Sequence, residues 1–359
     1  MRAMRPYLEF RIKIAKIPAN LCHNVRTSTA GRVHAGEGDP EMTVPYYAAH
    51  QVEALLDFSG GIQAMREAMA SLSAGGAQPL RQIFPLGDER LFAVMPGSLE
   101  AQSLFGAKVI SFFPQPGEAG RWRHRGMVLC FDGETGEPVC LADAEAVTTI
   151  RTACASAAAT DALARADADV LAVFGTGTQA ASHIRALAHV RPFRKMIIWG
   201  RSEERAAAMA ARFEAELGVA VTGTADGQGA AGEAQVICTT SSSAEPILLH
   251  EWIRPGTHVN LVGSSFLGPV EVDSALVAAG RYFADYRPSV LAQAAEFAVA
   301  RDAGLITDEH VVGEIGDVFA GRVAGREDED QLTIYKSLGH VVQDLAAALY
   351  VHRRSSIGS

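Results

Sequence analysis

The sequence predicts an α/β fold with two domains, one of antiparallel strands and one of alternating strands and helices. The chain has 359 residues, which is long enough for two domains of ordinary size. Before residue 164 the strand-like runs follow one another closely, whereas from Val170 strand-like and helical runs alternate. Such alternation is typical of a mostly parallel sheet with helices on both faces.

The first domain is predicted from a helical pattern followed by strand-like runs. Apolar residues at helical spacing cover residues 48–72, with Gly60 and Gly61 as an interruption. A hairpin signal, Gly133-Glu-Thr-Gly136, separates the last two strands, and a helix rich in small residues follows at 148–164. The expected strands are 80–84, 90–95, 107–113, 127–132 and 138–143.

The second domain is predicted from the alternation that begins at Val170. Helices are expected at 178–189 and 203–217. The final periodic segment, 333–351, is interpreted as one long helix that returns to the first domain, because the parallel sheet is expected to be complete by then. The expected strands are 170–174, 195–199, 219–222, 234–239, 258–262 and 281–285.

Composition excludes several classes of partner. The net charge of −9 leaves no basic face for nucleic acid, and no apolar run approaches the length of a membrane span. The five cysteines are scattered, without the spacing of a metal site, so we expect no metal and a reducing, cytoplasmic location. Residues 1–41 are basic and show little periodicity, and they are expected to form a disordered extension rather than a secretion signal.

The first motif follows the strand 170–174 and reads Gly175-Thr-Gly-Thr-Gln-Ala180. It is the strand–turn–helix opening of a Rossmann dinucleotide-binding unit, in which Gly175 permits the turn and Gly177 permits close approach of a pyrophosphate. Thr176, Thr178 and Gln179 complete the phosphate loop at the positive end of the following helix. The alternative is a glycine-rich turn that binds nothing.

The residues after the second strand of this unit indicate which dinucleotide binds. Where an NAD site carries an acidic residue, this chain has Arg201 and Ser202. Arginine suits a 2′-phosphate, so NADPH is expected, with NADH as the alternative. The competing interpretation is an arginine that only caps an exposed strand end. Thr239 and Thr240 are expected beside the nicotinamide ribose, and Val262 and Gly339 are further expected cofactor contacts.

Three cations are candidates for binding a substrate carboxylate. Arg81, Lys108 and Arg151 stand among small or apolar neighbours, and Lys108 interrupts an otherwise apolar strand. A lone basic residue in a strand more often belongs to a solvated face, and this reading stays open for each of them. His124 is either a surface-loop residue or a substrate contact.

These residues and several further stretches resemble the ornithine cyclodeaminase/mu-crystallin family from about residue 43 to 351. The resemblance implies that residues 42–163 and 318–351 form a substrate and dimerisation domain, into which residues 164–317 are inserted as a Rossmann domain. It also implies a homodimer, and that Arg81, Lys108 and Arg151 bind the substrate carboxylate. The matching stretches include Gln78-Pro-Leu-Arg-Gln82, Gly106-Ala-Lys-Val-Ile110, Arg151-Thr-Ala-Cys-Ala155, Phe174-Gly-Thr-Gly-Thr-Gln179, Ile253-Arg-Pro-Gly256 and Tyr335-Lys-Ser-Leu-Gly339.

One position divides this family by chemistry. Cyclodeaminases and related dehydrogenases carry a catalytic aspartate after the Val-Gly turn, and this chain has Ser265 there, with Ser264 beside it. No aspartate occurs between Val262 and Glu271, so the general base for oxidising an amine is missing. With Ser265 and Lys108 as catalytic residues, we expect a reductase of cyclic ketimines that converts Δ1-pyrroline-2-carboxylate or Δ1-piperideine-2-carboxylate to L-proline or L-pipecolate.

Three alternatives remain at this point. The first is a cyclodeaminase or amino-acid dehydrogenase, which would release ammonia in the presence of NAD. The second is a dehydratase of a hydroxyproline on the same scaffold, which would consume no NADPH. The third is a non-catalytic NADPH-binding protein.

Overall fold

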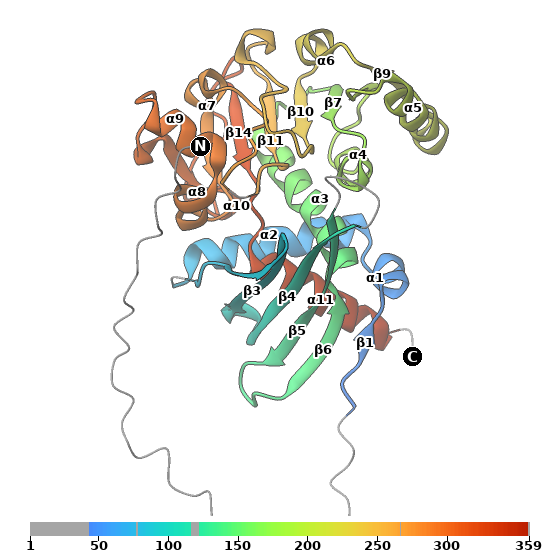
Figure 1. The fold of residues 1–359 in the computed structure, drawn as a ribbon, viewed down its shortest axis with the longest axis vertical. Coiled ribbons are helices and arrows are strands. Elements are labelled where there is room, and N and C mark those ends of the chain that lie inside the picture. The colour runs from blue at the N-terminus through green and yellow to red at the C-terminus, as the bar shows by residue number, and fades with distance from the viewer. Residues whose placement is uncertain (1–42, 77, 116–121, 266, 358–359) are drawn as a thin grey trace, which may run out of the picture. The chain divides into compact units, whose positions relative to one another are not determined.

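The computed structural model describes residues 43–76, 78–115, 122–265 and 267–357, and residues 44–359 form one compact unit. The expectation for residues 1–41 lies outside the described residues. The described chain has an α/β fold with two sheets, as predicted (Figure 1). None of its helices combines the length and the apolar character that a membrane crossing requires.

The first sheet has six strands in the order β1-β6-β5-β4-β3-β2, antiparallel except for the β1–β6 pair. One face is covered by helices, since a Cβ added at Gly106 would lie 2.9 Å from the Leu345 side chain of α11. The strands are β1 (Tyr46–Tyr47), β2 (Gln82–Gly87), β3 (Arg90–Leu99), β4 (Leu104–Pro114), β5 (Trp122–Asp132) and β6 (Pro138–Asp143); the helices packed near them are α1 (Ala49–Leu55), α2 (Phe58–Ala74), α3 (Ala144–Leu163) and α11 (Val341–Ile357).

The first helical segment breaks at a different point from the one predicted. Helix α1 ends at Leu55, and α2 begins after Asp57, whose side chain accepts a hydrogen bond from Gly60 N at 2.8 Å. Gly60 and Gly61 therefore lie inside the first turn of α2. They permit close packing, because a Cβ at Gly61 would lie 2.7 Å from Cys154 Sγ on α3.

The second sheet has eight parallel strands in the order β13-β12-β14-β11-β10-β7-β8-β9. Strands β8 and β9 lie on one side of β7, and β10 and β11 lie on the other, so the strand order reverses between β7 and β10. In open α/β sheets, ligands bind in the crevice at the carboxyl ends of such a strand pair. The strands are β7 (Val170–Phe174), β8 (Lys195–Trp199), β9 (Ala220–Thr224), β10 (Val236–Thr239), β11 (His258–Leu261), β12 (Arg281–Ala284), β13 (Val311–Glu314) and β14 (Thr333–Lys336); the helices are α4 (Thr178–Ala188), α5 (Glu203–Leu217), α6 (Gly227–Glu233), α7 (Ser274–Ala279), α8 (Arg287–Gln293), α9 (Ala295–Asp302) and α10 (Ile315–Phe319).

The prediction of one helix over 333–351 is wrong. Thr333–Lys336 is strand β14, which pairs with β11 on one side and β12 on the other, so the sheet is not complete before this segment. Thr, Ile and Tyr favour strands, and Gly339 then takes a φ of +83° that ends any regular structure before α11. The helix itself begins only at Val341.

Helix α3 connects the two halves of the molecule. It runs between the sheets in Figure 1, and it contacts β5 of the first sheet and β11 and β14 of the second. Most of its side chains are small and buried, which allows this close approach on several sides. It carries Arg151, whose buried side chain contacts Gln343 and Asp344 of α11.

Candidate active site

The turn after β7 has the geometry that a dinucleotide phosphate requires. Gly175 has a φ of +146°, and a Cβ there would lie 2.6 Å from Thr240 Oγ1, so only glycine fits. Gly177 is the N-cap of α4, and a Cβ added to it would meet nothing within 4 Å. Thr178 and Gln179 lie in the first turn of α4, and Thr176 precedes Gly177. This open helix N-terminus suits a pyrophosphate.

The end of β8 holds the residues predicted to select the nucleotide. Arg201 is exposed there. The Ser202 hydroxyl accepts a hydrogen bond from Arg205 N at 3.3 Å and so caps α5. Ser202 therefore has a structural task, whereas the Arg201 side chain lies at the surface.

Glu271, for which the sequence alone predicts no role, connects the ends of β10 and β11 through hydrogen bonds. Its buried carboxylate accepts hydrogen bonds from Thr239 Oγ1 at 2.7 Å and from Gly263 N at 2.7 Å. Burial raises the pKa of Glu271, and these bonds oppose that shift. The Thr239 hydroxyl is thus engaged with a carboxylate. Thr240 Oγ1 donates to the Phe174 carbonyl at 3.3 Å, and Val262 N donates to the Thr239 carbonyl.

The loop after β11 distinguishes the two neighbouring serines. Ser264 is buried, and its hydroxyl donates to Glu296 Oε2 at 2.6 Å. The fully buried Lys336 donates to the Ser264 carbonyl at 2.5 Å and pairs with Glu296 at 2.6 Å. Ser265 is half-buried, and its hydroxyl has no hydrogen-bond partner in the described part of the chain. Ser264 is therefore engaged in structural contacts, and a catalytic role of Ser265 stays a prediction.

Two of the three predicted cations meet at one buried carboxylate, Asp344. Lys108 of β4 is 3% exposed and lies 3.2 Å from Asp344 Oδ1, while Arg151 Nε donates to the same oxygen at 2.9 Å. Burial lowers the pKa of Lys108 to about 8. Although burial opposes ionisation of Asp344, the charges of Arg151 and Lys108 hold its pKa below the usual value. Two cations thus share one protein carboxylate, which leaves excess positive charge at the centre.

Arg81 joins this centre to the second sheet. Its guanidinium donates to the Ser265 carbonyl at 3.2 Å and to the Leu338 carbonyl at 2.8 Å. Gly339 lies between the two arginines, because its carbonyl accepts from Arg81 at 3.3 Å and a Cβ on it would lie 2.8 Å from Arg151 Nη2. The structure therefore brings Arg81, Arg151, Ser265 and Gly339 together.

His124 lies on the same face of the first sheet as Lys108, near the beginning of β5, where it is paired with Phe112 of β4. It is exposed, and its ring packs edge-on against Phe112 with 4.4 Å between centroids. Partial burial and the Lys108 charge lower the pKa of His124. No contact with the clustered cations is seen among the described residues, so a role of His124 in substrate binding stays a prediction.

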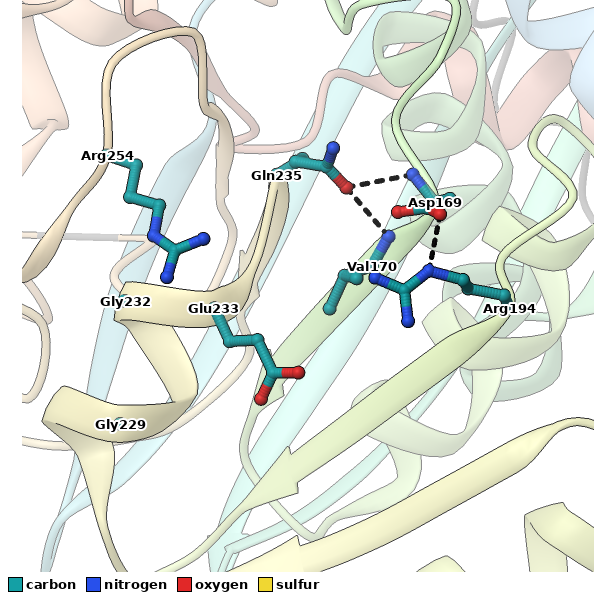
Figure 2. A pocket seen from close by; sticks show the side chains of 8 residues that line it. All are labelled: Asp169, Val170, Arg194, Gly229, Gly232, Glu233, Gln235 and Arg254. Carbon is teal, nitrogen blue, oxygen red and sulfur yellow. Dashed lines mark hydrogen bonds and ion pairs between the residues drawn. The ribbon is translucent and has the colours of Figure 1, made fainter.

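A cavity of about 660 Å³ opens at the opposite edge of the second sheet, where β7 and β10 begin (Figure 2). Figure 2 shows Arg194 paired with Asp169, and the Gln235 side chain accepting from the backbone of Asp169 and Val170. These groups satisfy one another, and none of the predicted site residues lies there. The carboxyl edge, where Arg81, Lys108 and Arg151 gather, is the better candidate.

Several buried charged residues at this centre were not found from the sequence. They come from segments far apart in the chain. The available signal in the sequence was a charged residue with apolar neighbours. They are Glu271, Asp285, Glu296, Lys336 and Asp344.

Comparisons with known proteins agree with this arrangement. The chain is 32% identical over 279 residues to a protein of Bacillus cereus named Δ1-pyrroline-2-carboxylate reductase, covering 77% of this chain and 86% of that one. It is 31% identical over 302 residues to ketimine reductase mu-crystallin of Mus musculus, covering 83% and 92%. The structure of Thermococcus litoralis Δ1-pyrroline-2-carboxylate reductase in complex with NADH and L-proline matches with a TM-score of 0.83 at 26% identity, covering 88% and 98%.

The sequence pattern of one family extends over nearly all of the described chain, matching residues 45–359. The chain belongs to the ornithine cyclodeaminase/mu-crystallin family.

Proposed function

We propose that this protein is an NADPH-dependent reductase of cyclic ketimines. Its expected substrates are Δ1-pyrroline-2-carboxylate and Δ1-piperideine-2-carboxylate, and its products are L-proline and L-pipecolate. Relatives named for the first of these reactions, and for ketimine reduction, support the proposal. A solved relative that binds NADH and L-proline supports both the cofactor class and the ligand class.

The observation that carries the proposal is the buried group of cations around Asp344. Asp344 is the one carboxylate within ion-pair distance of Lys108 and Arg151 among the described residues, and the charge of Asp285 also acts on the neighbouring Arg81. Three cations thus face two carboxylates of the described chain, and the remaining positive charge would hold the carboxylate of a ligand. Holding the carboxylate of a small ring at this point also fixes the orientation of the neighbouring C2 atom.

The serine loop supports reduction over oxidation of an amine. The Ser265 carbonyl accepts a hydrogen bond from Arg81 at 3.2 Å, which places this residue beside one of the proposed carboxylate-binding cations. The Ser265 hydroxyl suits a hydrogen bond to the ring nitrogen, but it cannot accept a proton as an aspartate would. An imine that is already formed and protonated needs no such base.

The open N-terminus of α4 supports a bound dinucleotide. Backbone donors at Gly177–Gln179 would hold the pyrophosphate, and Arg201 would hold the 2′-phosphate. When bound, the nicotinamide supplies the hydride that reduces C2. The hydrogen bonds of Glu271 hold the ends of β10 and β11 together, and the nicotinamide ring would lie against these strand ends.

The test is consumption of NADPH, followed by its absorbance, with each freshly generated ring and with NADH in parallel. Rapid oxidation of NADPH with either ring is expected. If neither ring supports oxidation of either cofactor, the proposal fails. Ammonia release from ornithine with NAD would then indicate a cyclodeaminase, and product from hydroxyproline without NADPH a dehydratase. Bound NADPH without any turnover would indicate a binding protein.

We also propose a homodimer that works in the cytoplasm. The outer face of the first sheet exposes large apolar side chains, among them Phe105, Phe84 and Met127, and such a face is typical of an association surface. Cys130 and Cys140 are directly paired across β5 and β6 yet carry free thiols, which favours a reducing compartment. Light scattering during gel filtration should give twice the chain mass; a monomer at micromolar concentration would contradict the first part.

A further inference from the structure

His340 lies where the two arginines of the site converge. It follows Gly339, whose carbonyl accepts from Arg81 and whose Cα packs against the Arg151 guanidinium. The His340 side chain is only 4% exposed. Its ring packs against Tyr286 with 4.8 Å between centroids, so its orientation is fixed by a neighbouring element.

The hydrogen bonds of His340 indicate which ring nitrogen carries the proton. Val342 N donates to Nδ1 at 3.3 Å, so Nδ1 is the acceptor and the neutral ring carries its hydrogen on Nε2. Burial lowers the pKa of His340 to about 4; the Asp344 charge opposes that shift and the Arg81 and Arg151 charges add to it, so the ring is neutral at pH 7. Nε2 is buried and has no partner within the described ranges. A buried N–H group in that position costs free energy unless an acceptor forms a hydrogen bond with it.

The two arginines near His340 already donate several of their hydrogen bonds to groups of the protein. Arg81 donates to the carbonyls of Ser265 and Leu338, and Arg151 donates to Asp344 and Gln343. A bound carboxylate has about four acceptor positions, so a further neutral donor would complete its hydrogen bonds without adding charge.

We propose that His340 binds the substrate, and that its Nε2–H donates a hydrogen bond to the carboxylate held by Arg81 and Arg151. This inference rests on the proposed function, because it names a further residue at the same site. It makes His340 the neutral member of the carboxylate site and the arginines its charged members. The tautomer is set by the first turn of α11, because Val342 N donates to Nδ1 and so leaves the ring hydrogen on Nε2.

Two substitutions separate this role from that of a helix cap. In His340→Asn, the side-chain oxygen still reaches Val342 N, but the donor at the far end of the ring is gone. In His340→Gln, the amide nitrogen takes the approximate place of Nε2, while the cap is lost. The measurements are titration calorimetry of pyrrole-2-carboxylate, a planar analogue, on the NADP+-loaded protein, the KM for Δ1-pyrroline-2-carboxylate, and the melting temperature.

We expect His340→Asn to raise both the dissociation constant and KM about tenfold with little change in melting temperature. His340→Gln should stay within about threefold in binding while melting earlier. Wild-type binding by His340→Asn would overturn the inference, as would weakening of both variants in proportion to their loss of melting temperature. A wild-type protein that binds the analogue but reduces neither ring would defeat the proposed function alone, since the binding comparison would still decide the role of His340.

Discussion

Replacing Asp344 by Asn tests whether one buried carboxylate holds the cationic centre together. The change keeps the shape of the side chain but removes the charge that Lys108 contacts at 3.2 Å and Arg151 at 2.9 Å. Asp344 is 0% exposed, so water cannot take its place. The variant buries two cations whose shared counter-charge is gone.

The magnitude follows from the two contacts. At an effective dielectric constant of about 20, each contact contributes about 5 kcal/mol of attraction, much of which offsets the desolvation of the charges. Breaking a buried ion pair by removing one partner typically costs about 3–5 kcal/mol, and we expect the free energy of unfolding to fall by that amount. Because a single domain unfolds with about 5–15 kcal/mol, the variant should still fold.

The same variant should change the pH dependence of substrate binding. Asp344 raises the pKa of Lys108, which burial lowers to about 8, so removing Asp344 should lower that pKa further. Lys108 binds a carboxylate only in its protonated form. The KM for the ring carboxylate therefore rises above about pH 8 in the wild type, and the rise should begin at lower pH in the variant.

Urea unfolding and KM between pH 6 and 9 are the measurements. Asp161→Asn is the matched control, because Asp161 also pairs with two arginines, Arg66 and Arg191, but at 40% exposure. It should lose about 1 kcal/mol or less. If Asp344→Asn loses no more than this control, and its KM profile does not move, the reasoning about the buried centre is refuted.

The remaining predictions concern the serines and the nucleotide. Ser264→Ala should lower the melting temperature with little effect on kcat, since it leaves Glu296 without its hydroxyl partner, whereas Ser265→Ala should lower kcat and leave the melting temperature unchanged; the reverse pattern would place the reactive serine one residue earlier. Arg201→Ala should lower kcat/KM for NADPH about ten- to a hundredfold and leave that for NADH nearly constant, and equal losses for both cofactors would contradict a phosphate contact. Gly175→Val should abolish cofactor binding in a fluorescence titration, because its side chain would collide with Thr240, and retained binding would disprove the tight turn.

The order of the elements could be predicted because local patterns specify them. Strands β7 and β8 and helix α5 begin and end at the expected residues, since each is an uninterrupted apolar or amphipathic run between glycine or polar residues. Strand β14 could not be found in the same way. It has four residues, and it is a strand only because β11 and β12 lie on either side of it, which no local pattern records.

The cations of the site were predictable as residues but not as an arrangement. Lys108 was conspicuous because a charge within an apolar strand needs a reason. Its partner Asp344 lies more than two hundred residues later, and no local pattern in the sequence connects the two. Ser264 differs from Ser265 because its hydroxyl contacts Glu296, which pairs with Lys336. Only folding brings these two residues to the serine loop.

The late position of β14 has a consequence for the chain as it is synthesised. The strand fills the gap between β11 and β12, and the same segment continues into α11, which delivers Asp344 to the other half of the molecule. A nascent chain that ends before Thr333 therefore lacks an interior strand of its nucleotide sheet and the counter-charge of its cations. Both halves are therefore incomplete until this last segment has been made, and a product truncated before Thr333 by premature termination or proteolysis would lose both groups at once.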